Sequence, residues 1–110
     1  MLYIRSLKEV TKMTISKTQN NSKLTIALDG RLDTTTAPQL EAEIKSSLNG
    51  ITELVFELSN LEYISSAGLR VLLSAQKIMN KQGKMVIHGA REEIMEIFDV
   101  TGFIDILTIE

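Results

Sequence analysis

The fold is decided by residues 54–73, which read LVFELSNLEYISSAGLRVLL. The first five residues are almost all apolar, which is typical of a strand covered on both faces. The end of the stretch and the residues after it place apolar side chains around most of a helix, which indicates that the helix is largely buried. We therefore predict a buried strand over residues 54–58, a connection over 59–65 and a helix over 66–81.

Strand and helix patterns also precede this stretch. Two short strands over residues 14–17 and 23–28 flank a turn at residues 20–22, which predicts an antiparallel pair. Gly30 then breaks the strand pattern, and a helix is expected over residues 36–48. Its first four residues, TAPQ, have the spacing of a capping box, and proline is tolerated in a first turn because its missing N–H has no partner there.

After residue 81 the alternation continues. Residues 85–87 predict another buried strand, residues 91–100 a third helix, and the tail at 103–109 alternates enough for a last, edge-like strand. Alternating strands and helices require parallel crossovers, so the predicted fold class is α/β: a small mixed, mostly parallel sheet flanked by helices, with an antiparallel first strand. We expect one domain over residues 13–110, preceded by an N-terminal extension at residues 1–12.

The composition excludes several classes of function. The chain has 110 residues, no Cys and one His, which argues against disulfides, thiol nucleophiles and metal sites rich in Cys or His. A formal net charge of -2 disfavours a nucleic-acid partner. No apolar run reaches the roughly 18 residues of a membrane span, and the first residues lack a signal-peptide pattern, so we expect a cytoplasmic protein that binds no membrane. We also expect no cofactor.

The first candidate site is Ser65-Ser66-Ala67-Gly68-Leu69-Arg70, between the buried strand and the buried helix. Ligands and partners of open α/β sheets are met at the carboxyl ends of the strands, and the free N–H groups of a helix start favour negative charge. A plainer interpretation is that one of the serines only caps the helix. No nucleophile elbow surrounds either serine, and the loop lacks the Gly spacing and Lys of a nucleotide-binding loop.

The second candidate site is Gly30-Arg31-Leu32-Asp33, which follows the second strand. Asp33 either helps to start the next helix or serves as a functional carboxylate. Because this segment and Ser66 both follow parallel strands, we expect them at the same edge of the sheet. His88 is interpreted as a structural residue, and no enzyme activity is expected because no base–nucleophile pair, metal set or cofactor loop is visible.

Residues 54–73 resemble the signature of STAS domains, specifically those of the bacterial anti-sigma factor antagonists. Residues 30–37, GRLDTTTA, are similar to the family's second block, and the resemblance extends over residues 14–109. The resemblance implies a binding protein that, when unphosphorylated, binds an anti-sigma factor serine kinase and so releases a sigma factor. It also implies that the kinase phosphorylates Ser66, that a PP2C-type phosphatase removes the phosphate, and that Asp33 contacts the kinase.

The resemblance assigns partner binding to both loops; the expected residues are Asp33, Thr34, Ser65, Ser66, Ala67, Gly68, Leu69 and Arg70. Many family members carry Asp immediately before the phosphorylated serine, whereas this chain has Ser65, so either hydroxyl could be the acceptor. The alternative function is a STAS-type sensor of a small ligand or anion without phospho-switching. We expect a monomer or weak dimer.

Overall fold

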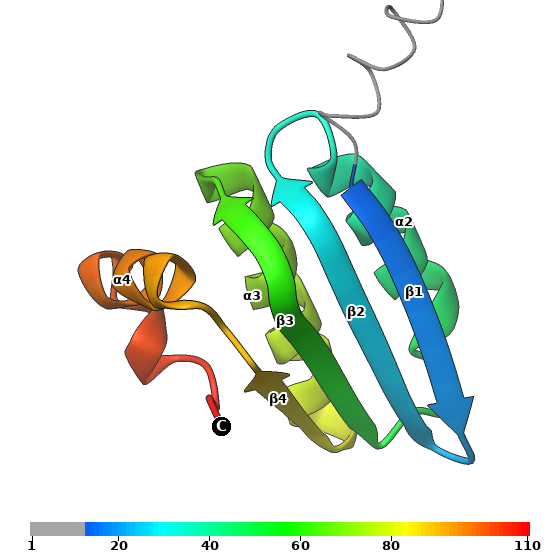
Figure 1. Ribbon diagram of the computed structural model, residues 1–110. Coiled ribbons are helices and arrows are strands. Elements are labelled where there is room, and N and C mark those ends of the chain that lie inside the picture. The colour runs from blue at the N-terminus through cyan, green and yellow to red at the C-terminus, as the bar shows by residue number, and fades with distance from the viewer. Residues whose placement is uncertain (1–12) are drawn as a thin grey trace, which may run out of the picture.

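The computed structural model describes residues 13–110 (Figure 1). Its four strands form one sheet in the order β1-β2-β3-β4, in which β1 and β2 are antiparallel and the other neighbours are parallel. The elements in chain order are β1 (Met13–Asn20), β2 (Lys23–Leu32), α2 (Ala37–Ser47), β3 (Glu53–Ile64), α3 (Ser66–Gln82), β4 (Lys84–His88), α4 (Glu92–Thr101) and the 3-10 helix η1 (Phe103–Asp105).

The predicted fold class is confirmed by this topology. Helices α2 and α3 lie side by side behind the sheet in Figure 1, and α4 lies beside β3. Alternate residues of the strands, such as Leu24, Ile26 and Phe56, are buried against the helices, as apolar residues with a period of two require. The extension expected at residues 1–12 lies outside the described residues.

The connection expected over residues 59–65 is wrong, because β3 continues as a strand to Ile64. Two register shifts in its pairing with β2, between Ala27 and Asp29 and between Gly30 and Arg31, each place one extra residue on β3. These bulges change the spacing of buried residues in the strand, so the alternation that identifies a strand in sequence is lost. The second register shift falls next to Gly30, whose φ of 110° favours glycine. The strand β2 continues through this residue to Leu32 instead of ending there.

The edge strand expected over residues 103–109 is also wrong. Gly102 adopts a left-handed conformation with φ of 81° and ends α4, and the chain then forms η1. Only Ile109 bridges to β4, through the Ile87 N–H to the Thr108 carbonyl and the Glu110 N–H to the Ile87 carbonyl, both at 2.8 Å. The apolar side chain of Leu107 is buried and fixes the tail by packing.

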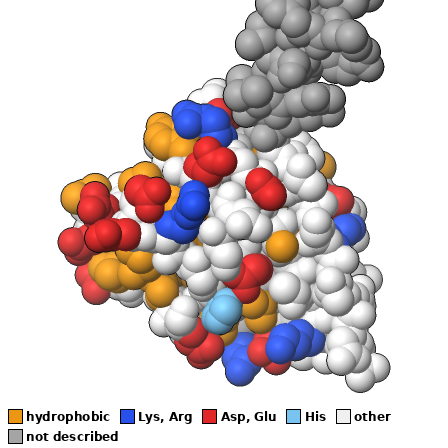
Figure 2. Space-filling view, viewed as in Figure 1, with side chains coloured by type: hydrophobic (Ala, Val, Ile, Leu, Met, Phe, Trp, Pro, Cys, Tyr) orange, Lys and Arg blue, Asp and Glu red, His pale blue; other side chains and the backbone are white. Residues whose placement is uncertain are grey.

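The face of the sheet that turns away from α2 and α3 carries polar side chains. Figure 2 views this face and shows few hydrophobic side chains over β1 and β2, with charged side chains near its lower end and around α4. Lys23 and Lys84 both lie 3.9 Å from Glu53 on this face. Because exposed ion pairs of this kind contribute little stability, the sheet is held mainly by the core on its other face.

Candidate functional site

The pairing of β2 with β3 brings the two candidate loops together. Leu32 and Ile64 are register partners at the ends of these parallel strands, and the Ser65 N–H donates to the Leu32 carbonyl at 2.9 Å. Asp33 therefore comes directly after Leu32, whose carbonyl is hydrogen-bonded to Ser65, the first residue of the second loop. The expectation that both segments leave the sheet at one edge is met by this geometry.

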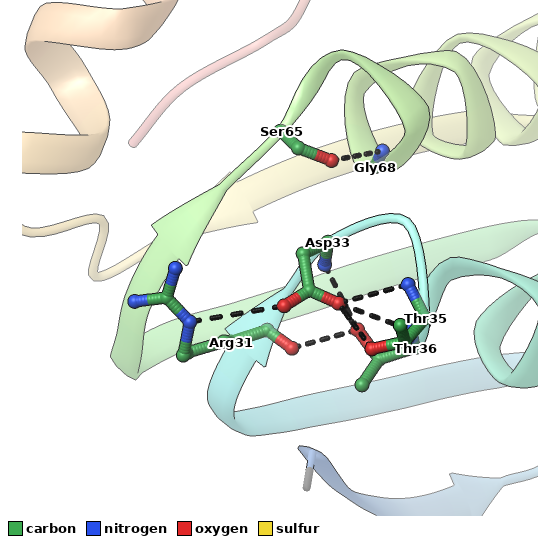
Figure 3. Close-up of polar contacts among 6 residues, drawn as sticks. All are labelled: Arg31, Asp33, Thr35, Thr36, Ser65 and Gly68. Atoms are coloured by element: carbon green, nitrogen blue, oxygen red, sulfur yellow. Dashed lines mark hydrogen bonds and ion pairs between the residues drawn. The ribbon is translucent and has the colours of Figure 1, made fainter. Parts of the chain in front are cut away.

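The two adjacent serines have different surroundings. Ser65 is the N-cap of α3, has extended backbone, and accepts a hydrogen bond from the Gly68 N–H at 3.5 Å (Figure 3). Ser66 is the first residue of the helix and is exposed. The capping role is thus filled by Ser65, and the hydroxyl of Ser66 is left facing solvent.

Gly68 sets how closely the start of α3 approaches the strand ends. It is buried, and a Cβ built on it would lie 2.6 Å from Leu32 Cγ and 2.9 Å from Ile64 Cγ1. The absence of a side chain therefore allows the first turn of α3 to rest directly on the last residues of β2 and β3.

The remaining expected residues of this loop divide into exposed and buried ones. Leu69 is 5% exposed and belongs to the core, so it supports the helix from inside. Ala67 and Arg70 line a shallow hollow of about 300 Å³ between α2 and α3, together with Thr34 from the β2–α2 loop. The hollow lies next to Ser66 along the chain, so a partner that contacts Ser66 would meet it as well.

The carboxylate of Asp33 organises the β2–α2 loop. Its Oδ1 accepts from the Thr35 hydroxyl at 2.7 Å, the Thr35 N–H at 3.0 Å and the Thr36 N–H at 3.2 Å (Figure 3). The Thr35 hydroxyl in particular holds the pKa of Asp33 below its ordinary value, because hydrogen bonds to the ionised form favour it. These bonds order the turn that leads into α2, in agreement with the first of the two roles that the sequence left open for Asp33.

The capping box expected at Thr36 does not form. The Thr36 side chain makes no capping hydrogen bond to α2; its buried hydroxyl instead donates to the Arg31 carbonyl at 2.7 Å and accepts from the Asp33 N–H at 2.9 Å. These bonds close the loop on itself, so the hydroxyl that the capping box required is already used.

Arg31 and Tyr63 form a contact that the sequence analysis missed. The Arg31 guanidinium lies 4.4 Å from the centroid of the Tyr63 ring, and its Nε lies 3.7 Å from Asp33 Oδ2. The two residues are register partners across β2 and β3. Only knowledge of that register, which includes a bulge, would have revealed the pair from sequence.

The ionised state of Asp33 leads to a prediction for Asp33→Asn. A carboxylate with a depressed pKa in the folded state stabilises the fold above its unfolded pKa, near 3.8, and loses that contribution as pH falls through the lower folded value. We expect wild type to melt at a higher temperature than the variant at pH 6, with the gap closing below pH 3.8. Thermal unfolding measured across this range tests the prediction. Asp29→Asn, at an exposed aspartate on the preceding strand β2, is the control. A difference in melting temperature between wild type and Asp33→Asn that does not depend on pH would contradict the prediction.

The single histidine lies away from this edge, on the open face of the sheet. His88 Nδ1 is 2.6 Å from Glu57 Oε1, and the Ser59 hydroxyl donates to the other carboxylate oxygen of Glu57. The Ser59 hydroxyl, followed by His88, lowers the pKa of Glu57. The serine is thus bonded to the carboxylate and not to the imidazole, which is not the order of a base-activated nucleophile. His88 is therefore hydrogen-bonded, as expected of a satisfied histidine, while its side chain is 58% exposed.

The described residues also show no metal cluster and no membrane-spanning helix. Within residues 13–110 no three His, Asp or Glu side chains are grouped so as to hold a metal ion. In the same part of the chain no helix is long and apolar enough to cross a membrane.

Comparison with known proteins identifies the family of the chain. Residues 6–110 match the family model of the STAS domain. The chain is 36% identical over 100 residues to BtrV of Bordetella bronchiseptica, covering 89% of this chain and 84% of that protein. It is 28% identical over 92 residues to the anti-sigma-B factor antagonist of Bacillus subtilis, covering 83% of this chain and 84% of that protein.

Solved structures share the fold. An anti-sigma factor antagonist from Mycobacterium paratuberculosis superposes with a TM-score of 0.82 at 23% identity, covering 90% of this chain and 86% of that one. The Bacillus cell fate determinant SpoIIAA in its phosphorylated form superposes with a TM-score of 0.70 at 16% identity, covering 88% of this chain and 91% of that one.

Proposed function

Because the chain belongs to the STAS domain family, we propose that it is an anti-sigma factor antagonist whose docking edge is formed by the β2–α2 loop and the start of α3. In this proposal the unphosphorylated chain binds an anti-sigma factor serine kinase, which frees a sigma factor. Phosphorylation of Ser66 by that kinase then ends the binding, and a PP2C-type phosphatase restores it. The activity is binding, and the chain itself catalyses nothing.

The exposed hydroxyl of Ser66 at the first position of α3 is the observation that carries this proposal. A kinase must reach the hydroxyl that it modifies, and Ser66 is accessible while Ser65 is half-buried and bonded to the Gly68 N–H. This difference favours Ser66 as the acceptor.

The position also explains how a phosphate could switch binding without unfolding the domain. A phosphoryl group adds about -1.5 to -2 charge at neutral pH. At the start of a helix that charge is favourable to the free domain, because the helix dipole and free N–H groups face it. In a complementary interface the same charge would be poorly compensated, so it opposes docking specifically.

Asp33 contributes to the proposed docking edge in two ways. Its Oδ1 holds the β2–α2 loop in shape, and its Oδ2 carries negative charge beside Arg31. A partner at this edge would therefore meet Ser66 and an ordered loop of defined charge.

Locating the phosphate tests the proposal. The chain is incubated with ATP and a candidate anti-sigma factor serine kinase, and the modified residue is identified by mass spectrometry. We expect label on Ser66, retained in Ser65→Ala and lost in Ser66→Ala. A chain that binds the kinase but is labelled elsewhere would contradict the assignment of Ser66. Thermal stabilisation by the nucleotide without any label would instead favour the anion-sensor function.

A further inference from the structure

We propose that Arg70 pairs with the phosphoryl group on Ser66 and so holds it against α3. The inference rests on the proposed function, since it takes Ser66 as the modified residue. Ser66 and Arg70 are both exposed and are four residues apart on α3. Residues at this spacing lie one above the other on a helix, with Cβ atoms about 5–6 Å apart, so long side chains at the two positions meet.

Arg70 is available for such a contact. The ion pairs of residues 13–110 join other side chains and leave Arg70 out. Glu41 is the acidic residue that lines the same hollow between α2 and α3, and its carboxylate pairs with Lys45 at 3.5 Å. Within the described residues, a phosphate on Ser66 would therefore meet an arginine that forms no ion pair with another side chain.

The chemistry favours arginine in this role. The guanidinium group is always charged and presents a planar set of donors that matches phosphate oxygens two at a time. The pairing has a consequence for switching: the modification adds charge to the docking edge and also withdraws a cation from it. Both changes alter the surface that the unmodified chain presents.

The test needs no kinase, because phosphoserine is encoded at position 66 during synthesis of the full chain. Phosphorus-31 NMR then follows the second ionisation of the phosphate in wild type, Arg70→Gln and Lys77→Gln. Lys77 is an exposed cation on the same helix, eleven residues from Ser66, and serves as the matched control. The helix start acts equally on all three proteins, so a difference between them reports the side chain.

We expect the acid dissociation constant of the phosphate to be about twofold larger in wild type than in Arg70→Gln, which is the size typical of a pair at this spacing. Lys77→Gln should match wild type, Arg70→Lys should recover part of the effect, and about 1 M salt should remove it. Equal constants in wild type and Arg70→Gln would overturn the proposal. Because the phosphate is encoded, failure of kinase labelling would count against the proposed function alone and leave this measurement readable.

Discussion

A chain carrying Ser66→Asp binds its anti-sigma factor kinase at least about 30-fold more weakly than wild type, if the proposed docking edge is correct. An uncompensated charge in a complementary interface costs about 2–5 kcal/mol, which corresponds to roughly 30- to several-thousand-fold in affinity. Ser66 is exposed at the start of α3, so the new carboxylate is tolerated in the free domain. The melting temperature should therefore stay within about 3 °C of wild type. Because about 1 kcal/mol shifts it by 4–8 °C in a domain of this size, this limit corresponds to a change of less than about 1 kcal/mol in the free energy of unfolding.

Isothermal titration with the kinase and thermal unfolding of the free variant measure the two parts of this prediction. Thr18→Asp introduces the same charge at an exposed position on β1 and should bind as wild type does. Ser66→Ala should also retain binding, because it adds neither charge nor bulk. Normal affinity in Ser66→Asp, or loss of its fold, would show that Ser66 does not act as proposed.

Gly68→Ala is expected to destabilise the domain, although alanine is the better helix former. Helix propensity alone predicts a gain of about 0.5–1 kcal/mol for this change. The new methyl group would lie 2.6 Å from Leu32 Cγ and 2.9 Å from Ile64 Cγ1, and both neighbours are buried at the strand ends. Overpacking of this kind costs about 1–3 kcal/mol, so we expect a net loss of about 1–2 kcal/mol in the free energy of unfolding.

Chemical denaturation of Gly68→Ala and Ser74→Ala distinguishes packing from propensity. Ser74 is exposed on the same helix, and its replacement should be neutral or slightly stabilising. Since the first turn of α3 must move to admit the methyl group, Gly68→Ala should also slow phosphorylation of Ser66. A Gly68→Ala chain more stable than wild type would mean that the contact between α3 and the strand ends is looser than the structure describes.

The buried elements were predictable because their sequence patterns depend on burial alone. The apolar run at residues 54–58 and the apolar helix after Ser66 lie within β3 and α3, and their order required the parallel pairing that the sheet shows. That pairing, in turn, places Asp33 beside the start of α3. Topology therefore located the candidate site before any side-chain contact was known.

The missed features depend on register and on hydrogen-bond competition. The bulges that carry β3 to Ile64 erase its alternating pattern, and they also create the pairing of Arg31 with Tyr63. The TAPQ sequence fits a capping box, but the Thr36 hydroxyl accepts from the Asp33 N–H instead of from an N–H of α2, and it donates to the Arg31 carbonyl. Sequence spacing cannot show which of two available partners a hydroxyl prefers.

NMR spectra of the isotope-labelled chain, recorded with the kinase before and after ATP is added, test the central claim most directly. Before ATP, we expect binding to shift the amide signals of Asp33 and of Ser66 through Arg70, and to leave those of Thr25 and Val55 on the open face unchanged. After phosphate transfer, the shifted signals should settle at positions that further kinase no longer alters, with the rest of the spectrum still that of a folded domain. Shifts centred on the open face, or a complex that persists once Ser66 is modified, would contradict the account.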